Sequence, residues 1–346
     1  MKAVNGIKER TEETEEAVQI PLMLLNVSFE PGHCLECIRH IKNPVLQDMA
    51  LTEYYYFTGQ HERAVTKAVS YLHDENLKTR IGAWLIYTFG NMAMGNAEQA
   101  KTGIRHLRTI TKRKAEIEDS KEVQLLLAGV KLLLRFPISE EARQQMEDRE
   151  SLCDEVGRLF SCYLMEQEAW KNGEYERAIG GVEAILLLSQ KNAPLYFIYL
   201  YLIAASAALH LKELSRAEAY FDKAWELARA DGFYVPLGEQ HGRLSVLVEK
   251  KIRKEDPEVY KKIMEVTHQY RTGWRSIIEG EDIFHNLEKL TGMEYAVAQL
   301  AGLEWSNQEI ADYLEISLRT VKCHMTSIFS KLHIGSRKGL VGKYPH

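Results

Sequence analysis

Apolar residues recur at three- and four-residue spacing along almost the whole chain before Gly292, and this pattern constrains the fold more than any other. The spacing is that of an amphipathic helix, whereas the alternating β-branched runs typical of strands are scarce. Only eight prolines interrupt the pattern in 346 residues. The sequence therefore predicts an all-α protein with almost no strand.

Helical hairpins repeat within this region. In three segments a glycine stands five residues before an alanine: Gly59, Gly95 and Gly173 before Ala64, Ala100 and Ala178. The full set of anchor alanines is Ala64, Ala100, Ala142, Ala178 and Ala217. Glycine lets the chain turn sharply between antiparallel helices, and alanine lets the two helices approach closely. We therefore expect helix pairs that stack into a superhelix, with segments 54–72 and 166–188 most similar to tetratricopeptide repeats.

The repeat pattern stops before the C-terminus, which indicates separate domains. Asp256 and Pro257 predict the start of a helix that runs to about Tyr270. The stretch that follows, RTGWRSIIEGEDIFHNLEKLTG, mixes glycines with charged and polar residues and loses the repeat spacing. We expect a helical-repeat domain over 1–271, a linker over 272–288 and a small helical bundle over 289–346.

Charge is distributed unevenly along the chain. No Asp or Glu occurs from Ser317 to His346, where six cations lie: Arg319, Lys322, Lys331, Arg337, Lys338 and Lys343. Because the whole chain carries −5, residues 1–316 carry −11. A basic tail on an acidic body favours binding of a polyanion by the tail alone.

The stretch SNQEIADYLEISLRTVKCHMTSIFSKL, residues 306–332, predicts two short helices joined by a tight turn. Ser306 and Glu309 form a capping box, which starts the first helix. Glu315 and Ile316 form the turn, and a serine caps the second helix. This arrangement is a candidate helix-turn-helix.

Each of these two helices has an apolar inner face. The inner residues are Ile310, Ala311 and Leu314 in the first helix, and Val321, Met325, Ile328, Phe329 and Leu332 in the second. The outer face of the second helix carries Arg319, Thr320, Lys322, Cys323, Thr326, Ser327 and Ser330. Cations meet phosphates and short polar side chains approach base edges, so this outer face suits the major groove of DNA.

A family resemblance supports this interpretation. SNQEIADYLEISLRTVKCHMTSIFSKLHIGSRKGL resembles the DNA-binding domain of LuxR-type transcription regulators, with its pattern S-N-x-E-I-A, L-x-I-S-x-x-T-V-K-x-H, K-L-x-V and S-R. The resemblance covers about residues 288–342. It implies that the second helix enters the major groove of double-stranded DNA and that Lys322, Cys323 and Thr326 contact bases. Both the charge and the resemblance favour Lys322 first.

The resemblance also implies supporting roles around that helix. Thr320, His324, Lys331 and Arg337 are expected to hold phosphates or the domain's own backbone. Arg319, on the outer face, completes the set of expected DNA-binding residues.

Some positions depart from the family pattern. Met293 and Ala296 stand where the family has a charged pair, so we expect the contact made by that pair to be missing. Glu304 stands where a helix-ending glycine is usual, and a left-handed cap costs a non-glycine residue about 1 kcal/mol. The last helix contains Gly339 and Gly342 and is expected to be short. Because the family's last helix often carries dimer contacts, formation of a homodimer stays open.

The long helical part predicts a sensor. The chain contains no G-x-x-x-x-G-K-[ST] phosphate loop, which excludes the nucleotide-switching domain of MalT-like regulators. The scarcity of strand patterns argues against a phospho-acceptor receiver and against the fold that binds acyl-homoserine lactones. What remains resembles the helical-repeat portion of MalT-like regulators joined to the DNA reader. Concave helical surfaces bind small molecules, peptides or proteins, so we expect an unidentified effector of one of these kinds.

Two kinds of cluster have competing interpretations. The aromatic runs 53–57 and 196–201 could form a ligand-stacking wall, but hairpin core is favoured, as it is for His61, Tyr175 and Trp225. His33, Cys34, Cys37 and His40 could approach metal-ligand geometry on one helical face. No second Cys/His pair lies at a usual spacing, so buried free cysteines are favoured over a metal site.

Other functions find little support. No stretch is apolar enough for a membrane helix, and the charged N-terminus lacks a signal sequence, so we expect a cytoplasmic protein. The carboxylates lie on solvated faces, and the sequence predicts neither a catalytic site nor a cofactor. The main alternative to a DNA-binding regulator is a protein-interaction scaffold whose helix-turn-helix has lost its DNA-binding function.

Overall fold

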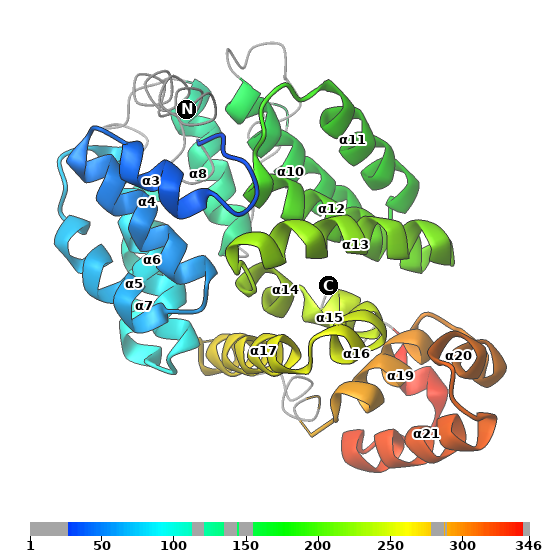
Figure 1. The fold of residues 1–346 in the computed structure, drawn as a ribbon. Coiled ribbons are helices and arrows are strands. Elements are labelled where there is room, and N and C mark those ends of the chain that lie inside the picture. The colour runs from blue at the N-terminus through cyan, green and yellow to red at the C-terminus, as the bar shows by residue number, and fades with distance from the viewer. Residues whose placement is uncertain are drawn as a thin grey trace. The chain divides into compact units, whose positions relative to one another are not determined.

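The computed structural model describes residues 27–112, 121–134, 155–277 and 289–341, together with Gln144 and Leu287. Every regular element within these ranges is a helix, which confirms the predicted all-α class (Figure 1). The chain divides into two compact units, Met1–Tyr234 and Val235–His346, here called the first and second units. Within the described part, no helix is both long enough and apolar enough to cross a lipid bilayer.

The first unit consists of antiparallel helix pairs. Its helices are α3 (Cys34–His40), α4 (Pro44–Phe57), α5 (His61–Ala68), η1 (Val69–Tyr71), α6 (Leu77–Ala93), α7 (Ala97–Lys112), α8 (Lys121–Leu133), α10 (Glu155–Lys171), α11 (Tyr175–Leu188), α12 (Pro194–His210) and α13 (Leu214–Asp231). Four successive pairs, α4 with α5, α6 with α7, α10 with α11 and α12 with α13, pack as hairpins (Figure 1).

One turn geometry joins the helices of all four hairpins. Gly59, Gly95 and Gly173 have positive φ angles of 80°, 77° and 79°, as a sharp turn between antiparallel helices requires. Lys212 takes the same place in the fourth hairpin, with φ of 60°. In each turn the next amide donates to the carbonyl five residues earlier, as Glu213 does to Ala208 at 2.9 Å. The glycine spacing therefore predicted three of these turns. The fourth turn has Lys212 in place of the glycine.

The anchor alanines pack as predicted wherever the structure describes them. Ala64, Ala100, Ala178 and Ala217 have no exposed surface, and each lies in the first turn of the second helix of its hairpin. Ala142 lies outside the described residues. The small side chain at these positions brings the two helices of a pair together.

The start of the first unit contacts its end. Phe29 N–H donates to the carbonyl of Asn192 at 3.1 Å, and the carboxylate of Asp231 accepts from the amides of Gly32 and Cys34 at 2.7 and 2.9 Å. The rings that surround buried Phe233 are Phe29, Tyr54 and Phe57. The stacked hairpins therefore close on themselves within this unit.

The clusters with two interpretations fall mainly in the core. Cys34 and Cys37 are buried, whereas His33 is exposed and bonds Glu36. No three His, Cys, Asp or Glu side chains among the described residues are grouped so that they could hold a metal ion. The aromatic runs contribute the buried residues Tyr56, Phe57 and Tyr196. The other aromatic residues of the runs are half-buried, so the runs lie only partly in the hairpin core: Tyr54, Tyr55, Phe197, Tyr199 and Tyr201.

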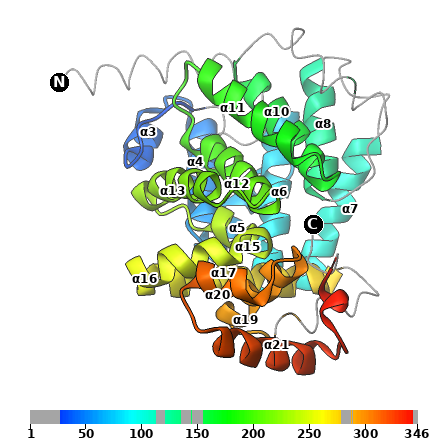
Figure 2. The ribbon, with the colours of Figure 1, turned by 90° about the vertical axis from the view of Figure 1, so that its right-hand side faces the viewer.

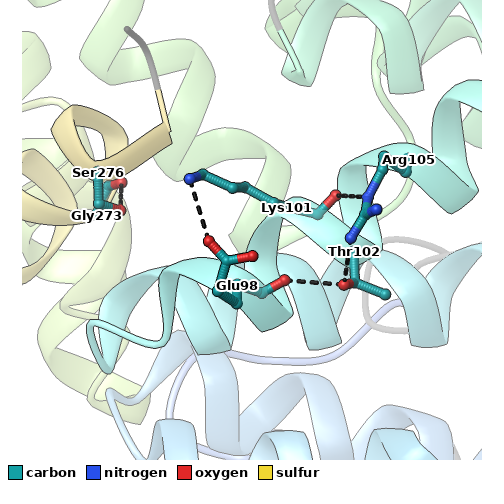
Figure 3. A network of polar contacts seen from close by, with 6 residues as sticks. All are labelled: Glu98, Lys101, Thr102, Arg105, Gly273 and Ser276. Atoms are coloured by element: carbon teal, nitrogen blue, oxygen red, sulfur yellow. Dashed lines mark hydrogen bonds and ion pairs between the residues drawn. The ribbon is translucent and has the colours of Figure 1, made fainter.

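The outer face of α7 carries cations that are held by the helix itself. Figure 3 shows Lys101 paired with Glu98 at 3.2 Å, and Arg105 donating to the hydroxyl of Thr102 at 3.0 Å. All these contacts join residues three or four apart on one helix, and such pairs contribute a few tenths of a kcal/mol, about 0.2–0.5 each. They support α7 and do not form a site.

The second unit contains the candidate helix-turn-helix. Its helices are α14 (Val235–Glu239), α15 (His241–Leu247), the π-helix η3 (Val248–Ile252), α16 (Arg253–Glu255), α17 (Pro257–Ile277), α19 (Gly292–Gly302), α20 (Asn307–Leu314), α21 (Leu318–Leu332) and η4 (Arg337–Leu340). Within it, α14 packs on α17 and α15 packs on α19. Helix α21 packs on both α19 and α20 (Figure 2).

The region of the predicted linker is partly helical. The helix predicted from Asp256 and Pro257 is present as α17, and it continues past Tyr270 to Ile277. It therefore occupies 272–277, the first part of the predicted linker, while most of the remainder lies outside the described residues. The domain limits 1–271, 272–288 and 289–346 stay a prediction.

Candidate DNA interface

The two helices of the candidate motif begin and end where their caps place them. Ser306 accepts a hydrogen bond from the amide of Glu309 at 3.2 Å, and the Glu309 carboxylate accepts one from the Ser306 amide at 2.5 Å, which completes the predicted capping box. Glu315 ends α20 in the left-handed conformation, with φ of 56°. Ser317 then caps α21 by accepting from the amide of Thr320 at 3.0 Å. Local contacts thus define the turn between α20 and α21.

The inner faces of both helices are largely buried as predicted, and Tyr313, which was not predicted to face inward, is buried with them. The buried residues are Ile310, Ala311, Tyr313, Leu314, Val321, Met325 and Ile328. Phe329 and Leu332 are only half-buried. The apolar stripe of α21 therefore faces α19 and α20 and leaves its opposite side to solvent.

The exposed side of α21 carries most of the predicted contact residues. Arg319, Lys322, Cys323 and Thr326 are exposed, and their spacing of three, four and seven residues places them on one face. Thr320 and His324 flank this face and are half-buried. No carboxylate occurs on α21, so its surface attracts polyanions without an opposing charge.

Two predicted residues hold the domain together. The ammonium of Lys331 lies 2.6 Å from the buried carboxylate of Glu294 on α19. The guanidinium of Arg337 donates to the side chain of Asn307 at 3.0 Å and more weakly to the carbonyl of Ala301 at 3.4 Å. Arg337 thus contacts a backbone carbonyl of its own domain, whereas Lys331 contacts a side chain. Their expected contacts with phosphates stay a prediction.

Sequence reasoning missed Glu294. Its carboxylate accepts from Lys331 and from the hydroxyl of Ser327, at 2.6 Å each, and also completes a capping box with Thr291. Burial disfavours the ionised form, but these hydrogen bonds outweigh it and lower the pKa of Glu294 from 4.5 to about 2. Glu294 thus makes a charged contact between α19 and α21 although Met293 and Ala296 carry no charge. The pattern T-x-x-E at 291–294 predicts its capping role but not its contact with α21.

Ser327 also differs from its predicted place. The helical spacing assigns it to the outer face, but its hydroxyl is half-buried against Glu294. It lies one position beyond Thr326 on the helix, which turns it toward α19. Ser327 therefore belongs to the inside of the domain.

The predicted irregularities at the ends of the domain are present. Glu304 adopts the left-handed conformation with φ of 60°, and its neighbour Trp305 donates to the carbonyl of Leu300 at 3.1 Å. After α21 ends at His333, the last described element is the four-residue 3-10 helix η4. The chain thus builds the helix-turn-helix with a short final element.

Helices outside the motif pack firmly on α19. The buried side chain of Gln299 accepts from the hydroxyl of Ser245 at 2.5 Å and from the amide of Val246 at 3.1 Å, and donates to the carbonyl of Arg243. These bonds satisfy both halves of the Gln299 amide. The motif is therefore joined to α15 by polar contacts that a flexible tether would not make.

A second contact joins α15, α17 and α19. The guanidinium of Arg271 lies 4.0 Å from the centre of the Tyr295 ring and 3.0 Å from Nδ1 of His241. Arginine only donates, so Nδ1 of His241 accepts and its Nε2 carries the proton. Complete burial and the charge of Arg271 lower the pKa of His241 well below its usual value. The imidazole is therefore neutral and packs as part of the core.

These features define what the site can do chemically. Its exposed face offers cations, a thiol and hydroxyl groups on a rigid helix, which is suited to binding phosphates and base edges. The caps, the Glu294 contact and the packing on α15 hold that helix in position.

Comparison with known proteins agrees with this geometry. Residues 288–343 match the family model described as bacterial regulatory proteins of the luxR family. Over 48 residues the chain is 46% identical to the transcriptional regulatory protein ComA of Bacillus subtilis (strain 168), an alignment that covers 14% of this chain and 22% of ComA. The chain thus matches about a fifth of that relative's length. No solved structure matches the chain. The C-terminal segment is a LuxR-type helix-turn-helix domain.

Proposed function

We propose that this protein is a DNA-binding transcription regulator and that α21 reads double-stranded DNA in the major groove. The observation that carries the proposal is the exposed face of α21, where Arg319, Lys322, Cys323 and Thr326 lie together without a carboxylate. The similarity to the luxR family and to ComA supports it. In this proposal Lys322, Cys323 and Thr326 contact bases, while Arg319, Thr320 and His324 contact phosphates.

Lys331 and Arg337 have a different part in the proposal. Their cations already bond Glu294 and Asn307, so their main role is to hold α19, α20 and α21 in the geometry that α21 needs. Any phosphate contact that they make is secondary to this role.

Replacement of Lys322 by Glu tests the proposal directly. The variant places a carboxylate at the centre of the face, so we expect binding to a duplex of about 30 base pairs to be lost at 0.1 M salt. Fluorescence anisotropy of a labelled duplex, measured across a range of salt concentrations, gives the affinity. Lys261→Glu is the matched control, because Lys261 is an exposed cation on α17 that pairs with Glu258.

The outcomes of this test also separate the proposal from its main alternative. A scaffold with a non-binding helix-turn-helix predicts that the wild-type chain shows no salt-dependent affinity for any duplex. Equal binding by the wild type and by Lys322→Glu would contradict the assignment of α21 as the reading helix.

We further propose that the first unit receives the signal that controls DNA binding. Its stacked hairpins form a compact unit distinct from the one that contains α21, which is the arrangement that a receiving domain needs. The effector is a small molecule, peptide or protein. The proposal includes neither enzymatic activity nor a cofactor, and it places the chain in the cytoplasm together with its DNA. The mass of the full chain, measured free and on DNA, tests whether it acts as a homodimer.

A further inference from the structure

A basic segment of the second unit lies beside the turn of the helix-turn-helix. Its four cations are Lys250, Lys251, Arg253 and Lys254, on η3 and α16. They precede the segment that matches the luxR family by more than thirty residues. The chain therefore brings cations from outside the LuxR-type domain to its edge.

Two of these cations pair within their own segment. Arg253 lies 2.9 Å from the buried carboxylate of Glu249, and Lys251 lies 3.8 Å from Glu255. Their charge is offset by carboxylates four residues away on the same segment. They are therefore not the cations that the segment offers to a partner.

The other two cations reach the motif itself. The ammonium of Lys250 lies 4.1 Å from the centre of the Tyr313 ring on α20, a distance at which the cation and the ring attract each other. The ammonium of Lys254 lies 3.0 Å from the carboxylate of Glu315. Lys250 thus anchors the segment on α20, and Lys254 extends to the turn that leads into α21.

Glu315 occupies a sensitive place for a DNA-binding surface. It is the residue in the left-handed conformation at the end of α20, two residues before the cap of α21. When a recognition helix lies in the major groove, its N-terminal residues approach base edges and the helix before it crosses the phosphate backbone. A carboxylate at this turn repels phosphates, whereas an ammonium beside it attracts them.

The pair between Lys254 and Glu315 is suited to exchange. Both side chains are 64% exposed, and an ion pair between exposed groups contributes little to stability because water and salt screen it. A DNA phosphate also accepts from lysine and releases condensed counterions when it does so. Exchange of the Glu315 carboxylate for a DNA phosphate as the partner of the Lys254 ammonium is therefore favourable.

We propose that Lys254 is an accessory phosphate-binding residue of the DNA interface, held beside the turn by Glu315 until DNA replaces that carboxylate. The inference rests on the proposed DNA binding by α21 and extends the interface to η3 and α16. In this proposal, η3 and α16, which lie outside the segment that matches the luxR family, contribute part of the affinity for DNA. That part does not depend on base sequence.

The test is the salt dependence of binding by four forms of the full-length chain: wild type, Lys254→Gln, Glu315→Gln and the double variant. The probe is a labelled mixed-sequence duplex of about 30 base pairs, since phosphate contacts do not depend on sequence. Loss of one phosphate contact lowers the slope of log affinity against log salt by about 0.9, which is roughly an eightfold weakening at 0.1 M relative to 1 M. We expect this change in Lys254→Gln and again when Lys254→Gln is added to Glu315→Gln. Glu315→Gln alone should strengthen binding.

Lys261→Gln serves as the control, because it removes an exposed cation of α17 that pairs with Glu258. It should leave the slope unchanged. An unchanged slope in Lys254→Gln would overturn the inference while leaving DNA binding intact. So would a loss that disappears in the Glu315→Gln background, because Lys254 would then only neutralise Glu315. A wild-type chain that binds no duplex at low salt would overturn both this inference and the proposed function.

Discussion

Four described residues other than glycine adopt a left-handed backbone: Lys212, Glu304, Glu315 and His333. Each ends a helix, where the next amide reaches back to a carbonyl five residues earlier. In the first unit the equivalent positions are glycines in three of the four hairpins. A side chain at such a position costs about 1 kcal/mol, because its Cβ approaches the following carbonyl. Turns of one type, with a strained left-handed backbone at a non-glycine residue, therefore occur in both units.

Lys212→Gly should stabilise the first unit. Glycine removes the strain at the turn between α12 and α13, and the gain of up to about 1 kcal/mol is partly offset by the greater freedom of the unfolded chain. Urea unfolding of the full-length chain measures the change. The matched control is Gly173→Ala, which introduces a side chain at φ of 79° and should destabilise by about 1 kcal/mol or more. Stabilisation by both variants would contradict the role assigned to this turn.

Glu294 should make the second unit sensitive to acid. Its pKa of about 2 lies below the ordinary 4.5, so its contribution is complete above about pH 4.5 and is lost as the pH falls toward 2. A shift of this size corresponds to a contribution on the order of 3 kcal/mol at neutral pH. Glu294→Gln should remove it, and the difference from wild type should shrink between pH 5 and pH 2. Urea unfolding at several pH values checks this, with Glu258→Gln on the exposed face of α17 as control.

At the scale of helices, one amide side chain of α19 makes three hydrogen bonds to α15. The side chain of Gln299 accepts hydrogen bonds from the Ser245 hydroxyl and the Val246 amide and donates one to the carbonyl of Arg243. Gln299→Leu should cost about 2 to 4 kcal/mol, because it leaves the amide of Val246 and the carbonyl of Arg243 buried without these partners. Amide hydrogen exchange should rise in α15 and α19 and stay unchanged in α11. Gln308→Leu is the control, since Gln308 on α20 is exposed and bonds Asp312 one turn along the same helix. Equal protection of α15 and α19 in wild type and Gln299→Leu would contradict this role of Gln299.

Much of the helical pattern could be predicted from local features. The positions of Gly59, Gly95 and Gly173 predicted turns because a left-handed conformation favours glycine, and Ser306 predicted the start of α20 because its side chain caps the helix. Both signals act over a few residues, so the sequence alone carries them. Lys212 escaped the pattern because tertiary packing can impose the same turn on a residue with a side chain.

Contacts between residues far apart in the sequence could not be predicted from these local features. Glu294 and Lys331 are 37 residues apart, and Lys254 and Glu315 are 61 residues apart. No periodicity specifies which charged side chains meet across such distances. The exposed face of α21 could be predicted because helical spacing sorts its residues onto one side, whereas the supports of that helix required the structure.

At the scale of the whole molecule, the division after Tyr234 places α14 to α17 in the same unit as the helix-turn-helix. Positive charge at the interface then comes from α21 and, by the inference above, from η3 and α16. Residues 1–316 carry a net charge of −11, and such a negative charge disfavours binding of DNA away from the proposed interface. In the proposed regulation, a signal received by the first unit would have to change the affinity of the second unit for DNA.

Selection from a pool of random duplexes tests whether α21 reads DNA sequence. The full-length wild type and the Lys322→Glu variant are each used to enrich bound duplexes at fixed salt near 0.15 M, where non-specific binding is weak. We expect the wild type to enrich one defined sequence motif and Lys322→Glu to enrich none. A wild-type selection without any enriched motif, or the same motif recovered by both proteins, would contradict it.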